Sequence, residues 1–337
     1  MIVCCGEALV DMVPWGGEGE AFLPRPGGCP FNTAIAAARL GAKVEFLGRI
    51  GRDLFGSQLA EALEADGVGT RLCARSDEPA TLAFVRRDRR GDARYAFYSN
   101  GAADRSLSIS DLPAGLGPDA RFLALGSISL LQEPSGSAIE ALAARESGRL
   151  LVSLDPNIRP SLVADRGSHL ARLLRVASSS AIVKASDDDL RWMFPGLGVE
   201  DAARALLDAG ASLVAATLGA AGALAMTRRA SARVAAPAVE VVDTIGAGDT
   251  FHAALLARLE AAGARSRADL EALDADFLRG ALEYACAAAA LDCTRAGAEP
   301  PRAPELEAFL PAAYPRGAAR AECGAGIERS SKGVAQC

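Results

Sequence analysis

Short apolar segments recur along most of the chain, and the stretches between them carry apolar residues at helical spacing. This alternation is typical of a mostly parallel sheet covered by helices, because each parallel connection needs a crossover that a helix supplies. We expect strands at residues 2–10, 44–50, 122–125, 150–154, 181–184 and 213–218. We expect helices at residues 31–40, 55–66, 135–146, 187–194, 200–209 and 249–262. The first of these helices is closed by Gly41, and the pattern as a whole predicts an α/β fold.

The segment 81–98 departs from this alternation of strands and helices. Residues 81–86 and 94–98 alternate as strands do, and the polar segment 89–92 between them predicts a hairpin. Together with residues 18–25, the hairpin would form a small antiparallel flap, which we place at 12–26 and 75–105. Such a flap is expected to act as a substrate lid or a dimer surface, and the alternative is a hairpin that only packs on the sheet edge.

The ordered domain is expected to span residues 1–311. The remaining residues, 312–337, are rich in Ala, Gly, Arg and Ser without periodicity, so they are predicted to be disordered.

Charge and composition exclude several classes of function. The chain has 36 basic and 42 acidic residues, a net charge of −6, and it contains no polybasic run, which argues against nucleic-acid binding. No uninterrupted apolar stretch is long enough to span a membrane. The opening strand has no basic segment before it, so we expect no secretory signal and a cytoplasmic location. Eight cysteines without a C-x-x-C pair, and only two histidines, disfavour a disulfide scaffold, a zinc site and a Ser-His-Asp hydrolase.

The most informative stretch is 241–251. A strand is expected to lead into Gly246, Ala247 and Gly248, and a helix follows. Glycines let backbone amides converge, and the start of a helix adds partial positive charge, so this turn predicts a phosphate site. Asp249 lies within it, either as a helix cap or as a general base beside a transferred phosphoryl group. The spacing alone leaves both open.

Two other phosphate motifs are absent from the sequence. A Walker A loop needs Gly-Lys followed by Ser or Thr, and the three lysines are followed by Val, Ala and Gly. A dinucleotide fingerprint should follow the first strand, where the chain instead reads Gly6-Glu7-Ala8. A P-loop NTPase and a Rossmann dehydrogenase are therefore disfavoured.

A second group of polar residues lies near the N-terminus. Asp11 ends the first predicted strand, and Gly27 and Gly28 precede Asn32 in the first turn of the next helix. Ligands of α/β sheets bind outside the carboxyl ends of the strands. A carboxylate and an amide placed there are suited to polyol hydroxyls, and the alternative is a turn with a capping Asn.

These motifs, together with the segment 48–56, resemble the ribokinase (PfkB) family of carbohydrate kinases over residues 1 to about 311. The segments 5–11, 27–34 and 155–160 look most like those of bacterial fructokinases. The resemblance implies a three-layer α/β/α fold with a mostly parallel central sheet and a small antiparallel β lid.

The resemblance also implies roles for individual residues. Asp249 matches the catalytic base, and Gly246, Ala247 and Gly248 match the anion hole. The sugar-contacting positions are matched by Asp11, Gly27, Gly28, Asn32 and Asp249. Arg159, in an element of the form D-x-N-x-R, would reach the oxygens of the transferred phosphate.

Nucleotide and metal positions are implied in the same way. Thr217, Gly219 and Gly222 resemble the nucleotide-binding turn, which on its own could be a hairpin loop, and residues 293–298 resemble the flank of the adenine pocket. Lys184 begins a segment similar to the family's N-x-x-E element, in which Asp189 would organise Mg²⁺ through water, unless it only starts a helix. Asp243 and Ile245 match positions that hold K⁺ in some members. His252 is interpreted as packing behind Asp249.

The implied activity is transfer of the γ-phosphate of ATP to a primary hydroxyl of D-fructose. The product is fructose 6-phosphate, and Asp249 acts as the base. The alternative substrate is 2-keto-3-deoxygluconate, whose carboxylate would need a lid arginine such as Arg86 or Arg94. A different class of function is a catalytically silent sugar sensor, which should have lost Asp249 or the anion-hole glycines. The expected partners are the sugar, ATP and a second copy of the chain bound through the lid.

Overall fold

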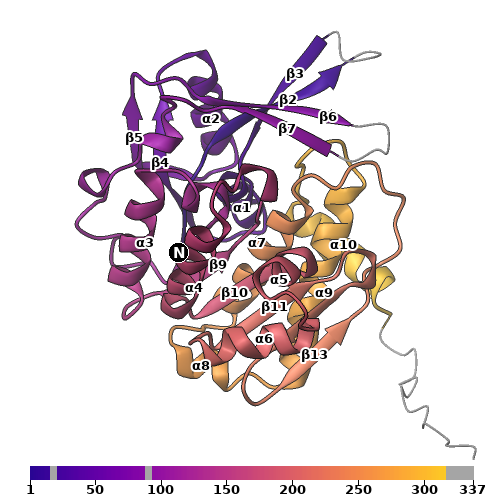
Figure 1. The fold of residues 1–337 in the computed structure, drawn as a ribbon. Helices are drawn as coiled ribbons and strands as arrows, with labels where there is room; N and C mark the ends of the chain where they lie inside the picture. The colour runs from indigo at the N-terminus through magenta and orange to yellow at the C-terminus, as the bar shows by residue number, and fades with distance from the viewer. Residues whose placement is uncertain (16–20, 88–92, 316–337) are drawn as a thin grey trace, which may run out of the picture.

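The computed structural model describes residues 1–15, 21–87 and 93–315 and contains two sheets (Figure 1). The larger sheet has nine strands in the order β13-β12-β11-β10-β9-β8-β1-β4-β5. Its strands are β1 (Ile2–Cys5), β4 (Val44–Gly51), β5 (Gly69–Ser76), β8 (Phe122–Gly126), β9 (Leu151–Asp155), β10 (Ile182–Ser186), β11 (Leu213–Thr217), β12 (Ala223–Met226) and β13 (Ser231–Val234). All pairs from β11 to β5 are parallel, and β12 and β13 add antiparallel strands at one edge.

Helices cover both faces of this sheet. One core is shared with α1 (Cys29–Arg39), α2 (Leu54–Ala65), α7 (Ala247–Ala261), α8 (Arg267–Glu271), α9 (Ala275–Cys293) and α10 (Ala303–Ala313). The other is shared with α3 (Ser135–Glu146), α4 (Arg166–Ser179), α5 (Asp187–Met193) and α6 (Val199–Asp208). In β1, Ile2 and Cys4 belong to the first core and Val3 and Cys5 to the second, as the two-residue period of a strand requires. The predicted three-layer α/β/α architecture is confirmed.

The smaller sheet has the order β3-β2-β6-β7 and projects from one end of the molecule (Figure 1). Its hairpins, β2 (Leu9–Trp15) with β3 (Ala21–Gly27) and β6 (Thr81–Arg87) with β7 (Ala93–Tyr98), are antiparallel, and β2 pairs with β6 in parallel. The predicted lid strands are therefore present. Residues 18–20 and the expected turn at 89–92 lie outside the described residues.

The predicted first strand, 2–10, is wrong as one element, because β1 belongs to the large sheet and β2 to the small one. The chain changes sheets at Gly6, whose φ of 150° is accessible mainly to glycine. A Cβ there would lie 2.6 Å from both Pro30 Cγ and Ser129 Oγ. The next residue, Glu7, is buried and donates its amide to Ser129 Oγ at 2.7 Å. Since both halves are buried, the sequence pattern cannot reveal the change of sheet.

The strand expected before Gly246 is also wrong. Residues 235–246 form no strand, and the side chains of Val241 and Val242 are exposed. The amides of Val242 and Asp243 instead bond to the carbonyl of Cys293 at the end of α9. A tertiary contact thus overrides local β propensity.

At the C-terminal end, α10 continues through Ala313, so the predicted boundary at 312 is two residues early. The Tyr314 hydroxyl donates to the Ala235 carbonyl at 2.7 Å. Residues 316–337 of the predicted tail lie outside the described part of the chain. Among the helices that are described, none is both long and apolar enough to cross a membrane.

Replacement of Gly6 should test the change of sheet. We expect Gly6→Ala to lower the free energy of unfolding by about 2–4 kcal/mol, because the new methyl group combines backbone strain with overpacking. Gly41→Ala is the matched control, since Gly41 has a φ of 90° but nothing within 4 Å of the added Cβ. It should cost about 1 kcal/mol. Equal losses in urea unfolding would contradict this account.

Candidate active site

The first turn of α7 follows a glycine and lines a pocket. Gly246, with a left-handed φ of 84°, precedes the helix, and its ideal Cβ would lie 2.5 Å from Ala298 Cβ. No described side chain caps this helix, and the Ala247 amide makes only a long bond of 3.4 Å to the Thr244 carbonyl, so the first turn can present amides to an anion. The cap interpretation of Asp249 is therefore wrong, and the anion-hole role of Gly246, Ala247 and Gly248 stays a prediction.

Asp249 is 7% exposed and points away from the amides of its own helix. Its Oδ2 accepts a hydrogen bond of 2.9 Å from Nδ2 of Asn32 in α1. Burial raises the pKa of Asp249 to about 6, although hydrogen bonds from Cys29 and Asn32 oppose the increase. The predicted capping role of Asn32 is also wrong, since Gly28 precedes α1 and the Asn32 amide serves Asp249.

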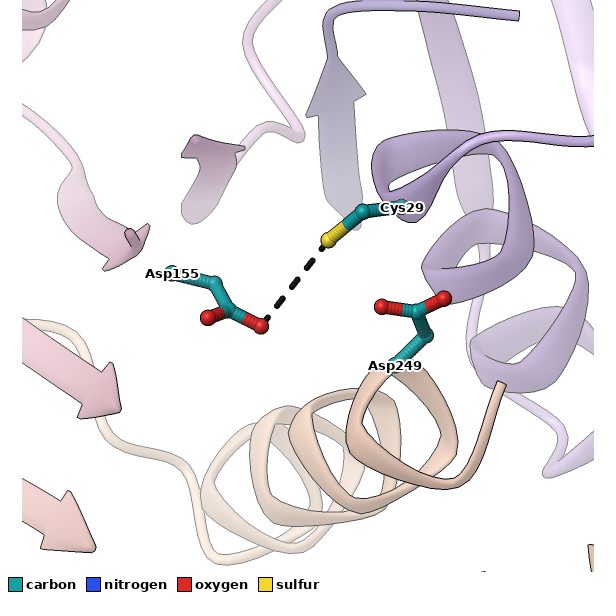
Figure 2. Close-up of side chains that lie close together, drawn as sticks. All are labelled: Cys29, Asp155 and Asp249. Atoms are coloured by element: carbon teal, nitrogen blue, oxygen red, sulfur yellow. Dashed lines mark hydrogen bonds between the residues drawn. The ribbon is translucent and has the colours of Figure 1, made fainter. Parts of the chain in front are cut away.

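A buried ion pair lies beside Asp249, at the carboxyl ends of β9 and β10. Lys184 Nζ is 2.8 Å from Asp155 Oδ2, and both side chains are less than 5% exposed. Burial alone would lower the pKa of Lys184, but the Asp155 carboxylate raises it above the ordinary value. A Cβ on Gly248 would lie 3.0 Å from Lys184 Nζ, so the ammonium lies directly against the anion turn. Asp155 lies opposite Asp249 in Figure 2. It was not predicted as a site residue, although an acid at the end of a buried strand could have indicated it.

Asp11 enters the same region from β2 of the small sheet. Burial raises its pKa to about 7, the nearby charge of Asp249 raises it further, and Arg159 acts in the opposite direction. A Cβ on Gly27 would lie 2.3 Å from Asp11 Oδ2, and one on Gly28 would lie 2.8 Å from the Glu7 carbonyl. Both predicted glycines are thus needed to make room for the Asp11 carboxylate and the start of α1.

Arg159 is half-buried and held by its own loop. Its Nη1 donates to the carbonyl and the side-chain oxygen of Asn157. The loop is joined to α5 because the Ile158 amide donates to Asp189 Oδ1 at 2.8 Å. Arg159 therefore faces the site from a fixed loop, where its charge reaches Asp11.

A pocket of about 550 Å³ brings the two predicted nucleotide segments together. It is lined by Thr217, Gly219 and Gly222 from the β11–β12 connection, by Ala247 and Gly248 from α7, and by Cys286 and Cys293 from α9. Residues 218–222 connect two antiparallel strands, so the hairpin alternative is correct as local structure. The same hairpin forms one wall of the pocket.

The predicted metal residues are largely engaged with backbone. Asp189 forms a capping box with Ser186 and also accepts the amide of Ile158, so the interpretation as an acidic helix start is correct as structure. Burial is the main cause of the raised pKa of Asp189, and the charge of Asp155 raises it further. Asp243 accepts the amides of Thr244 at 2.8 Å and of Gly297 at 3.0 Å.

Sequence reasoning missed Asp292 at the end of α9. It is fully buried and makes no hydrogen bond of regular geometry with the described residues, although the Glu299 backbone amide interacts with its carboxylate. Its Oδ2 would be 3.2 Å from a Cβ on Gly246, and burial raises its pKa to about 7. His252 is hydrogen-bonded to Ser153 Oγ at 2.7 Å, and burial lowers its pKa to about 3, so it is a neutral packing residue as predicted.

Comparison with known proteins accounts for this arrangement. The sequence pattern of the pfkB family carbohydrate kinases matches residues 1–306. A fructokinase of Rhizobium leguminosarum bv. trifolii is 46% identical over 283 residues, covering 83% of this chain and 86% of the relative.

Two solved structures have the same fold. The fructokinase of Xylella fastidiosa with bound ATP has a TM-score of 0.84 at 30% identity and covers 92% of this chain and 98% of its own. The fructokinase of Vibrio cholerae O395 with fructose, ADP and calcium bound has a TM-score of 0.81 at 31% identity, with the same coverage. With its anion turn, its buried acid and a match over nearly all of the described residues, this chain belongs to the pfkB family of carbohydrate kinases.

Proposed function

We propose that this protein is an ATP-dependent fructokinase that converts D-fructose to fructose 6-phosphate. The observation that carries the proposal is the buried Asp249 carboxylate, held by Asn32 at 2.9 Å beside the uncapped first turn of α7. The similarity to fructokinases that bind fructose, ATP or ADP supports the choice of substrates.

The geometry explains how the chain would promote phosphoryl transfer. Asp249 accepts the proton of the attacking primary hydroxyl, so the oxygen gains nucleophilic character as the γ-phosphate approaches. The amides at 246–248 and the adjacent Lys184 ammonium stabilise negative charge on the phosphate oxygens. Arg159, on its loop, supplies a second positive charge on the sugar side.

Thr217, Gly219 and Gly222 would hold the nucleotide through the 550 Å³ pocket, whose inner end is the anion turn. Mg²⁺ bound with the nucleotide supplies further charge neutralisation. Asp189 is suited to contact it only through water, because amides and the Ser186 hydroxyl already occupy its oxygens.

The charge of the sugar site favours a neutral acceptor. Asp11 and Asp249 both face this site. Arg159 is the described cation whose charge acts on Asp11. An acceptor with a carboxylate, such as 2-keto-3-deoxygluconate, would meet this acidic pair. The side chains of Arg86 and Arg94, which were considered as its partners, lie outside the described part of the chain.

A monovalent cation, K⁺, is proposed to bind beside the 243–246 loop. Asp243 and Ile245 shape this loop. The buried Asp292 carboxylate, whose described contacts include only the Glu299 amide and no hydrogen bond of regular geometry, is the nearby negative charge that a cation would compensate. A cation there would let Asp292 remain ionised without repelling the phosphate in the anion turn.

The lid is proposed to close over the sugar and to join two copies of the chain. Trp15 and Tyr98 of the small sheet are 64% and 67% exposed, and Tyr98 stacks edge-on against Phe84. Large exposed aromatic residues are typical of protein interfaces. We also place the protein in the cytoplasm, since the six cysteines in the described ranges are free thiols.

Replacing the base should separate catalysis from stability. We expect Asp249→Asn to lower kcat for fructose by about 10²–10⁴-fold, because proton transfer in the transition state is lost. The variant should unfold at the same or a higher urea concentration at pH 8, since burial makes the charged form unfavourable in the folded state. Wild-type turnover in a coupled ADP-release assay would reject the mechanism.

The raised pKa of Asp249 predicts the acid limb of the pH profile. Only the ionised carboxylate accepts a proton, so kcat/KM should fall below an apparent pKa of about 6. Asn32→Ala removes a hydrogen bond that favours the charged form, and the limb should therefore move to higher pH. A limb that stays in place in this variant would show that Asn32 does not tune the base.

The cation proposal can be tested at constant ionic strength. Wild-type activity should rise when K⁺ replaces tetramethylammonium, and Asp292→Asn should weaken the apparent affinity for K⁺ by about tenfold or more, because the buried charge is gone. Asp276→Asn, an exposed acid near the start of α9, is the control and should leave the K⁺ response unchanged. An unaltered K⁺ response in Asp292→Asn would exclude Asp292 as a ligand.

A further inference from the structure

Three potential metal ligands meet at the base of the sugar site. Cys29 lies in the first turn of α1, Asp155 ends β9, and Asp249 lies in the first turn of α7. One ligand atom of each lies within 4.8 Å of the others, and all three residues are buried. Figure 2 shows the thiol and one oxygen of each carboxylate turned toward the same small space.

We propose that Cys29, Asp155 and Asp249 form a binding site for a thiophilic divalent cation such as Zn²⁺ or Cd²⁺, and that occupation of this site blocks the kinase. Only the inhibitory part rests on the proposed function. Binding of the ion depends on the three side chains alone.

The spacing agrees with tetrahedral coordination. With a metal–sulfur distance of about 2.3 Å and a metal–oxygen distance of about 2.1 Å, a tetrahedral site places sulfur and oxygen about 3.6 Å apart. Cys29 Sγ and Asp155 Oδ2 are 3.8 Å apart. This separation is thus close to the tetrahedral value. The other ligand-atom separations, each at most 4.8 Å, would have to shorten, more for Zn²⁺ than for the larger Cd²⁺.

One carboxylate oxygen of the cluster has no hydrogen-bond partner among the described residues. Asp155 Oδ1 is buried and accepts no hydrogen bond from any described residue. Asp249 accepts hydrogen bonds from the Asn32 amide and from the Cys29 thiol, and a metal–sulfur bond would replace the second of these. A buried acceptor without a partner is unfavourable, so an ion that reaches this position gains contacts that the folded chain does not itself supply.

The charges also match a divalent ion. Asp155 and Asp249 carry two negative charges, and Lys184, 2.8 Å from Asp155, offsets one. Burial and the two carboxylates raise the pKa of the Cys29 thiol well above its usual range, so without a metal it keeps its proton. When the metal–sulfur bond forms, this proton leaves to solvent, and the resulting two net negative charges are neutralised by the ion.

This site should bind cations that accept a thiolate in preference to cations that prefer oxygen ligands. Mg²⁺ prefers oxygen ligands in an octahedron and keeps much of its water, which a small buried space with a thiol cannot provide. Zn²⁺ and Cd²⁺ accept thiolate readily. Once bound, either ion would occupy the Asp249 oxygen that faces the substrate hydroxyl, so the base could no longer take a proton.

Cadmium gives a direct test on the purified full chain, without nucleotide or Mg²⁺. Equilibrium dialysis measures affinity, and the ultraviolet charge-transfer band of a thiolate–cadmium bond reports the ligand. Cys29→Ala and Cys29→Ser remove the thiol, and thermal unfolding verifies that they fold. The matched control is Cys73→Ala, which removes a half-buried thiol that contacts the Phe46 carbonyl away from the cluster.

We expect wild type and Cys73→Ala to bind one tight Cd²⁺ with the charge-transfer band. Both Cys29 variants should lose the band, and they and Asp249→Asn should bind roughly 100-fold more weakly, since even substitutions outside a ligand shell typically cost 10–100-fold. A tight site or a band that survives in the Cys29 variants, or wild-type affinity in Asp249→Asn, would overturn the proposal.

Inhibition provides the second readout. Zn²⁺ at saturating Mg²⁺ should inhibit fructose phosphorylation by wild type and Cys73→Ala in competition with fructose, and Cys29→Ala should resist it. Equal inhibition of Cys29→Ala would show that Zn²⁺ acts elsewhere. If the chain binds Cd²⁺ as expected but does not phosphorylate fructose, the proposed substrate is wrong and the metal site stands.

Discussion

The hydrogen bond between Asn32 and Asp249 is the contact on which the site depends, because it joins two helix starts that lie 217 positions apart. It fixes a carboxylate at the open first turn of α7, where that carboxylate could otherwise have capped its own helix. With its amides left uncapped, the turn can receive an anion while the acid beside it receives a proton. Both properties follow from directing one side chain away from its own helix.

The acids around this contact are unfavourable for folding unless they are compensated. Asp11, Asp249 and Asp292 all have raised pKa values because burial disfavours their charged forms. Lys184 neutralises Asp155 directly and also lowers the pKa of Asp249, as Arg159 does for Asp11 and Arg295 for Asp292. Burial outweighs these cations at the last three acids. These buried acids therefore lower the stability of the fold, which is common where catalysis requires perturbed pKa values. In return, the site can bind cations and phosphate and can accept a hydroxyl proton.

Gly6 determines that the site lies between two sheets. By turning the chain out of the large sheet immediately before β2, it places Asp11 on the small sheet while Asp155, Lys184 and Asp249 remain on the large layer. Movement of the small sheet would therefore change the distance between the Asp11 and Asp249 carboxylates. Closure of the lid, as proposed above, would therefore also assemble the proposed sugar site.

Local sequence determined the parts of this protein that short-range geometry controls. Apolar periodicity predicted most parallel strands of the large sheet and six of the helices, but not β5, β12, β13, α4, α8, α9 or α10. Gly246, Gly248 and Asp249 predicted a glycine turn before α7, because a left-handed residue before a helix is a local requirement. Tertiary structure alone decided that Asp249 bonds to Asn32 and does not cap its own helix, and where the first strand changes sheets. It also decided that the amides of Val242 and Asp243 bond to the end of α9. It also brought Cys29 to Asp155 and buried Asp292 behind Gly246. These outcomes depend on contacts between residues far apart in the chain, which no local pattern encodes.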